Sequence, residues 1–411
     1  MITLGKKALE AKDFLASVTE EQKNNALLAI ASALRSNSKT IIKENIKDLE
    51  NGRKAGLNEG LLDRLMLDEA RINGIADSVE NVVNLPDPCG KVIDEIERPN
   101  GLSIKKVTVP IGVIGIIYEA RPNVTADAAV LCLKSSNAVI LRGGKEAISS
   151  NIAIASVMRS AIKSCGFDEN CIQLVTDTSR NSANEMMKMN EYLDCLIPRG
   201  GKNLIKSVVE NSTVPVIETG SGNCHIYVDD DADIDMAAKI IFNAKTQRIG
   251  VCNACESLVI HSAIINTAMP EIKKLLDTKN VEIRGDEQAM LAADGILPAS
   301  DADFASEYLD YIISVKTVDT LDEAIRHINK NSTRHSEAII TNNDEHAKAF
   351  LQRVDSSSVY VNASTRFTDG GEFGLGAEIG ISTQKLHARG PMGLCELTTT
   401  KYLVFGNGQT R

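Results

Sequence analysis

Two stretches of this chain alternate short apolar runs with helix-like segments, and that alternation restricts the folds open to it. The first stretch extends from Ile111 to about Asp230 and includes the runs "IGVIGIIY", "NAVILR" and "DCLIP". The second extends from about Ser257 to Ala363 and includes "SLVIH", "YIISVKTV" and "EAIIT". Short buried strands that alternate with helices are typical of βαβ units, whose strands lie parallel in one sheet. We therefore expect an α/β protein with two α/β domains and parallel sheets.

The segments outside these blocks have different patterns. Residues 1–88 are predicted to be helical, because "NNALLAIASALRSN" and two charged segments after it repeat apolar residues at helical spacing. Residues 90–109 contain two β-prone runs on either side of Pro99, Asn100 and Gly101, which predicts a hairpin. This hairpin has little apolar surface of its own, and the tail "ELTTTKYLVFG" is also strand-like. We expect the tail to pair with the hairpin, within the chain or in a partner chain.

The charge and the cysteine content exclude several classes of partner. The 411-residue chain has a net charge of −10 and no tryptophan, whereas nucleic acids and anionic membranes select basic patches. We therefore expect no nucleic-acid partner and no membrane partner. The sequence contains no signal-type apolar run and no uncharged apolar stretch of membrane-spanning length. Nine cysteines, an odd number without a spacing framework, indicate free thiols and a cytoplasmic location.

A glycine pair follows one of the predicted strands. Neither the G-x-G-x-x-G fingerprint nor a P-loop is present, but "VILRGGKEAISSN" ends a strand at Arg142 and continues through Gly143, Gly144 and Lys145 into a helix. Two glycines at a strand end allow the backbone to approach a ligand closely, and two cations there favour an anion. The residues alone leave this interpretation open beside a solvated turn with two surface cations.

The stretch "TQRIGVCNACES" contains two cysteines, Cys252 and Cys255. A structural zinc site needs four ligands, and no second C-x-x-C pair or closely spaced histidine pair follows, so we expect no metal. Cys255 adjoins a predicted strand and is expected to pack as a small buried residue. The same is expected of four other cysteines: Cys132, Cys165, Cys171 and Cys195.

Cys252 has a different setting. A helix is expected to end at Gly250, so Cys252 lies on irregular chain at the junction of the two α/β blocks, where substrates often bind. Arg248 is close enough in sequence to lower the pKa of a thiol. These observations fit a nucleophile and a bystander about equally.

A carboxylate and a histidine lie upstream, in "ETGSGNCHIYV". Glu218 is expected to end a strand at the same junction, where a carboxylate can act as a general base. The alternative is a carboxylate held by backbone N–H groups of the glycine turn. His225 lies in a predicted strand and is expected to be a satisfied, partly buried imidazole rather than a catalyst.

The order of these motifs resembles that of a known superfamily. "ETGSGNCH", "DADID" and "QRIGVCN" follow one another as the corresponding motifs do in the aldehyde dehydrogenase superfamily, and the separation of Glu218 from Cys252 also fits. Within it, the chain is similar to a branch that reduces an amino-acid acyl phosphate. That similarity lies in "YEARPNVT", "ILRGGKEA", "IPRGG", "STRFTDGGEFGLGAEIGIST" and "HARGPMGL". Together the motifs cover essentially the whole chain.

The resemblance implies an NADPH-dependent reduction of L-glutamyl 5-phosphate to L-glutamate 5-semialdehyde and phosphate, the second step of proline biosynthesis from glutamate. A cysteine thioester is the implied intermediate. One alternative is a hydrolytic NAD(P)-dependent aldehyde dehydrogenase, whose activity would be indifferent to phosphate. A second is a catalytically silent relative that serves as a scaffold or sensor. Because an acyl phosphate is labile, glutamate 5-kinase is also considered as a partner.

The resemblance also assigns catalytic and substrate residues. Cys252 matches the nucleophile, and Asn123 joins the Cys252 backbone N–H as an implied oxyanion donor. Glu218 aligns with the hydrolytic base, but its role here stays open. Arg248 is expected to meet the phosphate of the substrate. The expected grip on the substrate carboxylate is formed by Arg366 with Ser364 and Thr365.

The implied cofactor is NADP(H). Its expected site comprises Arg142, Gly143, Gly144, Lys145, Gly200 and Gly201. In NAD-preferring relatives an acidic residue near the end of this strand holds the ribose hydroxyls. Here the corresponding positions, Arg142 and Lys145, are both cationic, which favours the 2′-phosphate of NADP(H) over NAD(H).

Three parts are expected from the resemblance. Residues 1–89 and 110–230, with part of 364–394, form the NADP-binding domain. Residues 231–363 form the catalytic domain that carries the nucleophilic cysteine. Residues 90–109 and 395–411 form a small β element for oligomerisation, so a homo-oligomer, dimeric or larger, is expected.

Overall fold

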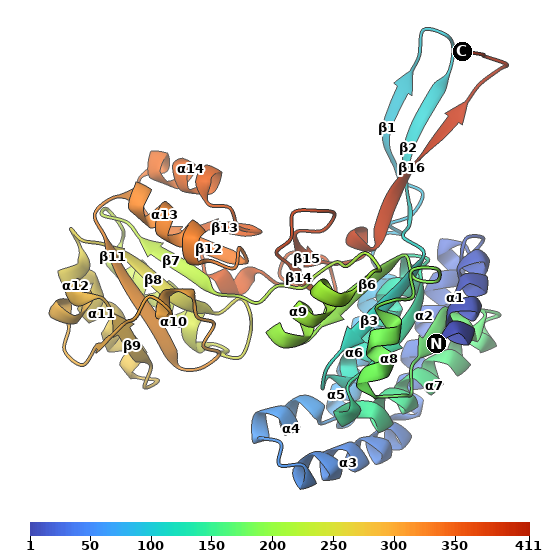
Figure 1. Ribbon diagram of the computed structural model, residues 1–411, viewed down its shortest axis with the longest axis horizontal. Coiled ribbons are helices and arrows are strands. Elements are labelled where there is room, and N and C mark those ends of the chain that lie inside the picture. The colour runs from blue at the N-terminus through green and yellow to red at the C-terminus, as the bar shows by residue number, and fades with distance from the viewer. The chain divides into compact units, whose positions relative to one another are not determined.

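The computed structural model describes residues 1–411 and divides into two compact units (Figure 1). Unit 1 comprises Met1–Thr219, Gly374–Gly380 and Met392–Arg411, and unit 2 comprises Gly220–Phe373 and Ile381–Pro391. Each unit combines helices with a parallel sheet, which confirms the predicted α/β fold. Each helix is too short or too polar to cross a membrane.

Unit 1 begins with five helices, as predicted for residues 1–88. They are α1 (Ile2–Leu15), α2 (Glu20–Ser36), α3 (Ser38–Lys54), α4 (Glu59–Leu65) and α5 (Glu69–Val83). A capping box starts α2, because Thr19 and Gln22 each accept a hydrogen bond from the other's backbone N–H. The buried face of α2, which includes Leu27 and Ile30, packs against α5.

The sheet of unit 1 has four parallel strands in the order β5–β4–β3–β6. Their bounds are β3 (Val113–Tyr118), β4 (Ala138–Arg142), β5 (Ile172–Leu174) and β6 (Cys195–Arg199). The helical segments between and after them are α6 (Pro122–Lys134), η1 (Lys145–Ala147), α7 (Ile148–Ser164), η2 (Glu169–Cys171), α8 (Arg180–Met186) and α9 (Lys202–Asn211). Because the strands are parallel, their carboxyl ends share one edge of the sheet, where ligands bind in such folds.

A separate three-stranded antiparallel sheet also belongs to unit 1 (Figure 1). It has the order β1–β2–β16, with β1 (Val92–Glu97), β2 (Ser103–Pro110) and β16 (Thr398–Phe405). The turn between β1 and β2 contains Gly101 at φ 84°, a conformation that glycine adopts without strain. The predicted hairpin and its pairing with the tail of the same chain are therefore confirmed.

Unit 2 contains a seven-stranded sheet in the order β10–β9–β11–β8–β7–β12–β13, in which all neighbours are parallel. The strands are β7 (Cys224–Val228), β8 (Cys255–His261), β9 (Glu282–Gly285), β10 (Leu297–Pro298), β11 (Ile312–Val318), β12 (Ser336–Ile340) and β13 (Ser358–Val361). The helical segments are α10 (Ile234–Thr246), α11 (Ile265–Asp277), α12 (Glu287–Ala292), η3 (Asp303–Ala305), α13 (Leu321–Asn331), α14 (Asp344–Arg353) and η4 (Thr365–Phe367).

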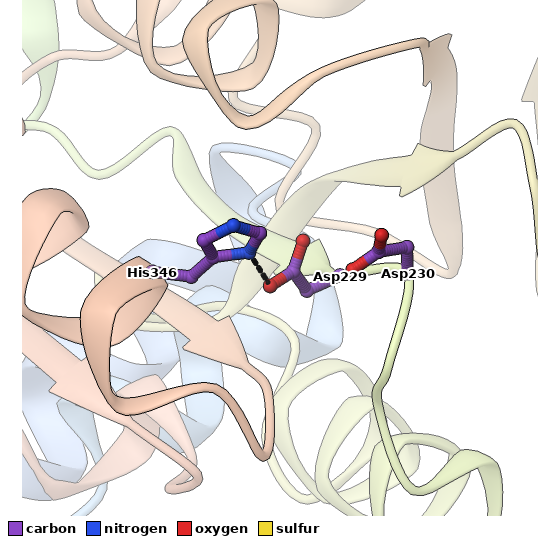
Figure 2. A group of neighbouring side chains, drawn as sticks. All are labelled: Asp229, Asp230 and His346. Atoms are coloured by element: carbon purple, nitrogen blue, oxygen red, sulfur yellow. Dashed lines mark hydrogen bonds and ion pairs between the residues drawn. The ribbon is translucent and has the colours of Figure 1, made fainter.

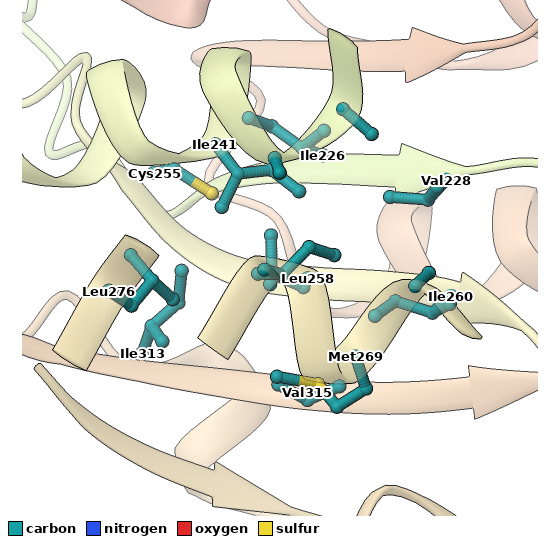
Figure 3. Close-up of a cluster of buried hydrophobic side chains, with 14 of the residues drawn as sticks. Ile226, Val228, Ile241, Cys255, Leu258, Ile260, Met269, Leu276, Ile313 and Val315 are labelled. Carbon is teal, nitrogen blue, oxygen red and sulfur yellow. The ribbon is translucent and has the colours of Figure 1, made fainter. Parts of the chain in front are cut away.

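Helices cover both faces of this sheet. Side chains of α10, α11 and α12 form the larger core on one face, and side chains of α13 and α14 form a smaller core on the other. Figure 3 shows the larger core, in which Leu258 and Ile260 of β8 lie among side chains of the neighbouring strands and helices. Cys255 is fully buried there, as predicted. Its side chain therefore packs as part of the hydrophobic core.

Of the other cysteines predicted to be buried, Cys132, Cys171 and Cys195 are buried and Cys165 is not. Cys165 is the C-cap of α7, and it lies exposed at the end of that helix. The apolar pattern of a helix does not predict the exposure of its C-cap residue, because the backbone leaves the helical path there and the residue no longer lies on the buried face.

Two expected boundaries are corrected: the one between the two domains and the end of α10. The domain boundary lies between Thr219 and Gly220 rather than at 230, because β7 pairs with β8 and β12 in the sheet of unit 2. The segment 364–394 is divided between the units; it contains β14 (Gly380–Ser382) and β15 (Gly390–Met392), and η5 (Cys395–Leu397) follows. Helix α10 ends at Thr246 rather than at Gly250, and the residues after it bend away to make the contacts described below.

Candidate active site

Cys252 lies on the irregular segment between α10 and β8 and is half-buried. The chain that leads into β7 passes directly against it. A Cβ atom at Gly222 would lie 1.4 Å from the carbonyl oxygen of Cys252, so only glycine allows these two backbones to approach so closely. Gly222 is held in turn by Glu307, whose Oε1 accepts the Gly222 N–H at 2.7 Å. The backbone that carries the predicted nucleophile is therefore fixed by its neighbours.

Asn253 connects the Cys252 segment to the turn that follows β13. The Thr365 hydroxyl donates to the carbonyl oxygen of Asn253 at 2.8 Å. The side-chain amide of Asn253 donates to the carbonyl oxygen of Thr368 at 2.9 Å. Thr365 and Asn253 are both buried, so these hydrogen bonds replace water that the groups have lost. The turn η4 and the Cys252 segment thus hold each other in place.

The Arg366 guanidinium lies near two groups, the Arg248 guanidinium and the Cys252 thiol. Arg366 donates from Nε to Gln247 Oε1 at 2.9 Å and from Nη1 to Asn253 Oδ1. Burial lowers the pKa of Arg366 and the charge of Arg248 lowers it further, while the nearby Cys252 thiol acts in the opposite direction. Arg248 itself is exposed. Arg248 and Arg366 together place two positive charges in this part of unit 2, which attract an incoming anion.

Ser364 does not have the predicted role of binding substrate. Its side chain is buried, and its Oγ accepts the backbone N–H of Arg366 at 3.3 Å, which caps η4. A buried capping hydroxyl is not available to a substrate carboxylate. The geometry therefore assigns Ser364 to the support of Arg366.

Glu218 lies in unit 1, whereas Cys252 lies in unit 2. The prediction that Glu218 ends a strand is wrong, because its segment forms only an isolated parallel bridge between Val216 and Leu196. Pro215 lacks the backbone N–H that a continuous ladder needs, which limits the pairing of this apolar run. The Glu218 side chain is half-buried.

Asn123, also in unit 1, lies exposed in the first turn of α6. Its side-chain amide donates to Asp127 Oδ2 at 2.9 Å. Burial raises the pKa of Asp127 to about 6, and the hydrogen bond from Asn123 opposes that shift. This bond uses one of the two N–H donors of the amide, and the second stays available to another acceptor. Sequence reasoning missed Asp127, although its spacing of four residues on a helix indicates the contact.

The predicted cofactor residues gather at the carboxyl ends of the strands in unit 1. Arg142 ends β4, and its Nη2 donates to the carbonyl oxygens of Thr178 at 2.8 Å and Ser179 at 2.9 Å. Burial lowers the pKa of Arg142. Lys145, three residues later, is exposed. A Cβ atom at Gly143 would lie 2.1 Å from Asn151 Nδ2, so the first position of the turn has no room for a side chain.

Glu119 joins the second predicted glycine pair to the first. It follows β3, and its Oε2 accepts the backbone N–H of Gly201 at 2.7 Å. A Cβ atom at Gly200 would lie 2.6 Å from the same oxygen, and one at Gly144 would lie 3.4 Å from the Glu119 Cα. The ends of β3, β4 and β6 therefore meet around this carboxylate. The sequence analysis did not identify Glu119. Its position directly after a buried strand could have indicated a site residue, because ligands bind at the carboxyl ends of parallel strands.

These residues suit a phosphate-bearing dinucleotide. The Nε atoms of Arg142 and Arg199 are buried without a hydrogen-bond partner, at the ends of β4 and β6. Buried donors without partners are rare in folded proteins and are expected to find an acceptor. Arg142, Lys145 and Arg199 supply positive charge, and the glycine pairs give the backbone access that a pyrophosphate needs.

His225 is fully buried in β7, as part of a polar group around Glu337. Glu337 Oε2 accepts the His225 backbone N–H at 2.6 Å and lies 3.1 Å from Nδ1 of the same ring. The Nε2 atom of His225 has no hydrogen-bond partner. The imidazole was predicted to be partly buried with its hydrogen bonds formed, whereas it is fully buried and one ring nitrogen has no partner. Its contacts fit a structural role in the sheet.

A second group of acidic and histidine side chains, Asp229, Asp230 and His346, lies near the carboxyl ends of β7 and β12 (Figure 2). His346 Nδ1 lies 2.6 Å from Asp229 Oδ2. The hydroxyls of Tyr227 and Thr341 also donate to Asp229, each at 2.8 Å. Both carboxylate oxygens of the buried Asp229 therefore already accept hydrogen bonds from protein side chains. We interpret the group as a structural hydrogen-bond network at this end of the sheet. Asp230 is exposed beside it.

Residues 3–293 and 300–401 match the model of the aldehyde dehydrogenase family. The chain belongs to this family. A gamma-glutamyl phosphate reductase from Lachnospira eligens is 59% identical over 408 residues, which cover 99% of this chain and 98% of the relative. A protein of the same name from Clostridium botulinum strain Eklund 17B is 58% identical over 411 residues, which cover 100% of this chain and 99% of the relative.

Solved structures agree with this assignment. The crystal structure of gamma-glutamyl phosphate reductase from Thermotoga maritima matches with a TM-score of 0.98 at 49% identity, covering 100% of this chain and 99% of that chain. The enzyme of the same name from Saccharomyces cerevisiae matches with a TM-score of 0.54 at 30% identity, covering 99% and 98%. The predicted family and fold are therefore confirmed, and membership of the family implies a nicotinamide cofactor.

Proposed function

We propose that the chain reduces L-glutamyl 5-phosphate to L-glutamate 5-semialdehyde and phosphate with NADPH, the second step of proline biosynthesis from glutamate. The observation that carries the proposal is the Arg366 guanidinium, which donates to Asn253, the residue after Cys252, and has Arg248 as a second cation near it. A cysteine that accepts an acyl group from an acyl phosphate needs cations for the departing phosphate, whereas a hydrolytic aldehyde dehydrogenase does not. The names of the relatives support the same substrate.

Cys252 is the proposed nucleophile. Its thiolate sulfur adds to the acyl carbon, the bond from that carbon to the phosphate oxygen breaks, and inorganic phosphate leaves with the electron pair. The product is a thioester on Cys252. Charge gathers on the departing oxygen while the bond breaks, so Arg248 and Arg366 stabilise the transition state more than the bound substrate.

The acyl oxygen gains negative charge when the sulfur adds. Its proposed donors are the backbone N–H of Cys252 and the side-chain amide of Asn123, which has one N–H beyond the one that it donates to Asp127. The bound nicotinamide cofactor supplies a hydride equivalent to the acyl carbon. Cys252 then departs as a thiolate and the aldehyde is released. Water would destroy the thioester, so Glu218 is not required as a base for water here and is assigned to substrate orientation or proton handling.

The proposed cofactor preference is NADP(H) over NAD(H). Lys145 is exposed at the turn after β4, and Arg142 is fixed beside it by two backbone carbonyls. Glu146 is the competing acid, because a Cβ atom at Gly144 would lie 2.7 Å from its Oε2. Asp177 is a second acid whose charge acts on Arg142, so the proposed preference rests on the exposed Lys145, which can reach a 2′-phosphate.

The three-stranded sheet is the proposed oligomerisation element, and its proposed partner is a second copy of the chain. Its exposed apolar side chains are Val92, Ile93, Ile96, Tyr402, Val404 and Phe405. The outer edges of β1 and β16 are unpaired within the chain. Apolar side chains beside open strand edges favour association, which would cover both.

A cytoplasmic location and a substrate handed over by glutamate 5-kinase complete the proposal. All nine cysteines are free thiols, which fits a reducing compartment. The kinase is proposed only because an acyl phosphate hydrolyses readily, and the reaction at Cys252 does not depend on it.

The phosphate dependence of the reverse reaction tests the proposal. Reduction of NADP⁺ by glutamate 5-semialdehyde is measured at increasing inorganic phosphate, with arsenate as a substitute. The rate is expected to rise with phosphate to saturation, and Arg248→Gln is expected to raise the KM for phosphate by about tenfold, the loss of about 1.4 kcal/mol. Lys239→Gln is the matched control, an exposed cation on the outer part of α10. A rate that is indifferent to phosphate would favour the hydrolytic alternative.

A further inference from the structure

A second thiol lies directly against the backbone of the proposed nucleophile. Cys224 is the first residue of β7 and is fully buried. Its Sγ lies 3.2 Å from the carbonyl oxygen of Cys252 and 3.8 Å from Nδ1 of His335. Because β7 and β8 are paired neighbours, with Cys224 opposite Cys255, the sheet itself fixes where this thiol lies.

The Cys224 thiol stays in its protonated form. Burial raises its pKa well above the usual range for a thiol, and the nearby charge of Glu337 raises it further. A protonated thiol can donate a single, weak S–H hydrogen bond. The carbonyl oxygen of Cys252 lies within hydrogen-bonding distance and can only accept, so Cys224 is the donor of this contact.

The same short segment supplies a second constraint on that carbonyl group. Gly222 provides the space into which the Cys252 carbonyl oxygen fits, and Cys224 provides the donor. The next carbonyl group, that of Asn253, is held separately by the Thr365 hydroxyl. Consecutive carbonyl groups with fixed partners leave the backbone little freedom to rotate at Cys252. The direction of the bond that carries the sulfur is thereby restricted.

We propose that Cys224 is a positioning residue for Cys252, because its S–H hydrogen bond to the Cys252 carbonyl sets the direction in which the nucleophilic sulfur points. The inference rests on the proposed role of Cys252. Attack on an acyl carbon demands near-attack geometry, and a displacement of about 1 Å can cost about 100-fold in rate. Cys224 acts only through the backbone, since its side chain is fully buried.

The test compares Cys224→Ala with Cys224→Ser in the full-length protein. Two assays are run. The first gives kcat and KM for phosphate-dependent NADP⁺ reduction by glutamate 5-semialdehyde, and the second gives the rate of Cys252 alkylation by iodoacetamide from about pH 6 to pH 10. Cys224→Ala is expected to lower kcat about tenfold or more with KM changed less than about threefold, and to alter the pH profile of alkylation. Cys224→Ser keeps a donor and is expected to restore both toward the original protein.

Cys255→Ala is the matched control. It removes a thiol that is equally buried but bonds to the carbonyl oxygen of Ser257, at 3.4 Å, instead of to Cys252. If Cys224→Ala does not fold, as judged by circular dichroism, Cys224→Val provides the same test, because it fills the volume and lacks the donor. Equal kcat and alkylation profiles for the Cys224 variants and Cys255→Ala would overturn the inference.

Failure of the proposed function would give a different result. Cys252→Ser would then keep its turnover. The alkylation rate of Cys252 would still report whether the loss of the Cys224 thiol displaces the Cys252 sulfur, because that measurement does not depend on the reaction catalysed.

Discussion

Cys252 and Cys255 lie in one short stretch of sequence but have different surroundings. Cys252→Ser is expected to lower kcat by about 1,000-fold or more, because a hydroxyl is hardly ionised at neutral pH and is a poor nucleophile. Cys255→Ala is expected to leave kcat within about twofold and to lower the free energy of unfolding by about 1–2 kcal/mol, since it opens a small cavity in the core. Steady-state kinetics and urea denaturation measure both effects. A similar kcat for the two variants would contradict the assignment of the nucleophile.

His346 predicts a pH dependence of stability. Its hydrogen bond to Asp229 raises the pKa of the His346 imidazole above its usual value of about 6.5. The stabilisation is therefore fully present below that usual value and is lost as the pH rises through the raised value in the folded protein. His346→Gln keeps a neutral donor, so its deficit in urea midpoint is expected to be larger at pH 6 than at pH 9. An equal deficit at both values would show that the charge of the imidazole does not matter.

Single residues could be predicted where the immediate sequence decides their surroundings. Cys255 adjoins an apolar strand, and its burial followed from that neighbour alone. Ser364 could not be predicted in the same way, because its burial and its cap on Arg366 depend on how η4 packs against the Cys252 segment. The partner of Asn123, Asp127, could have been predicted, because the two residues are four apart on a helix.

The turn between β4 and α7 carries the prediction on cofactor choice. Lys145→Glu is expected to raise the KM for NADPH about tenfold or more and the KM for NADH less than about threefold, because only NADPH brings a 2′-phosphate to this turn. Lys163→Glu is the matched control, an exposed lysine in the last turn of α7, away from the turn that carries Lys145. Equal effects of Lys145→Glu on the two cofactors would refute the preference.

Helices and hairpins were predictable where local chemistry specifies them. The capping box at Thr19 and Gln22 begins α2, and the glycine turn at Gly101 connects β1 to β2. The end of α10 was not predictable from Gly250. The segment after Thr246 instead bends where Gln247, Cys252 and Asn253 find hydrogen-bond partners far along the chain.

The three-stranded sheet carries a prediction about assembly. The double variant Tyr402→Asp/Val404→Asp is expected to lower the number of associated subunits, because it places two charges among exposed apolar side chains of β16. Sedimentation velocity measures the molecular mass in solution. Asn407→Asp, an added charge beyond the end of β16, is the control and is expected to leave the mass unchanged. An unchanged mass for the double variant would exclude this face of the sheet as the interface.

Two α/β domains and a third, small β element were predicted, whereas the chain divides into two units and the β element belongs to unit 1. The run "CHIYV" is apolar enough for either parallel sheet, and its pattern does not specify a neighbour. Its hydrogen bonds to β8 and to β12 place it in unit 2 and move the boundary to Gly220. Strand order depends on contacts between residues far apart in sequence, which local periodicity cannot report.

The α/β class, the helical first segment, the hairpin with its paired tail and the family all followed from the order of residues, because periodicity, turn chemistry and long motifs are local properties. The surroundings of Cys252 followed only from the tertiary structure. Gly222, Cys224, Thr365 and Arg366 reach this segment from other parts of the chain. Hydrogen bonds and close contacts of this kind depend on distances of a few ångströms, and those distances are set when the strands and turns pack.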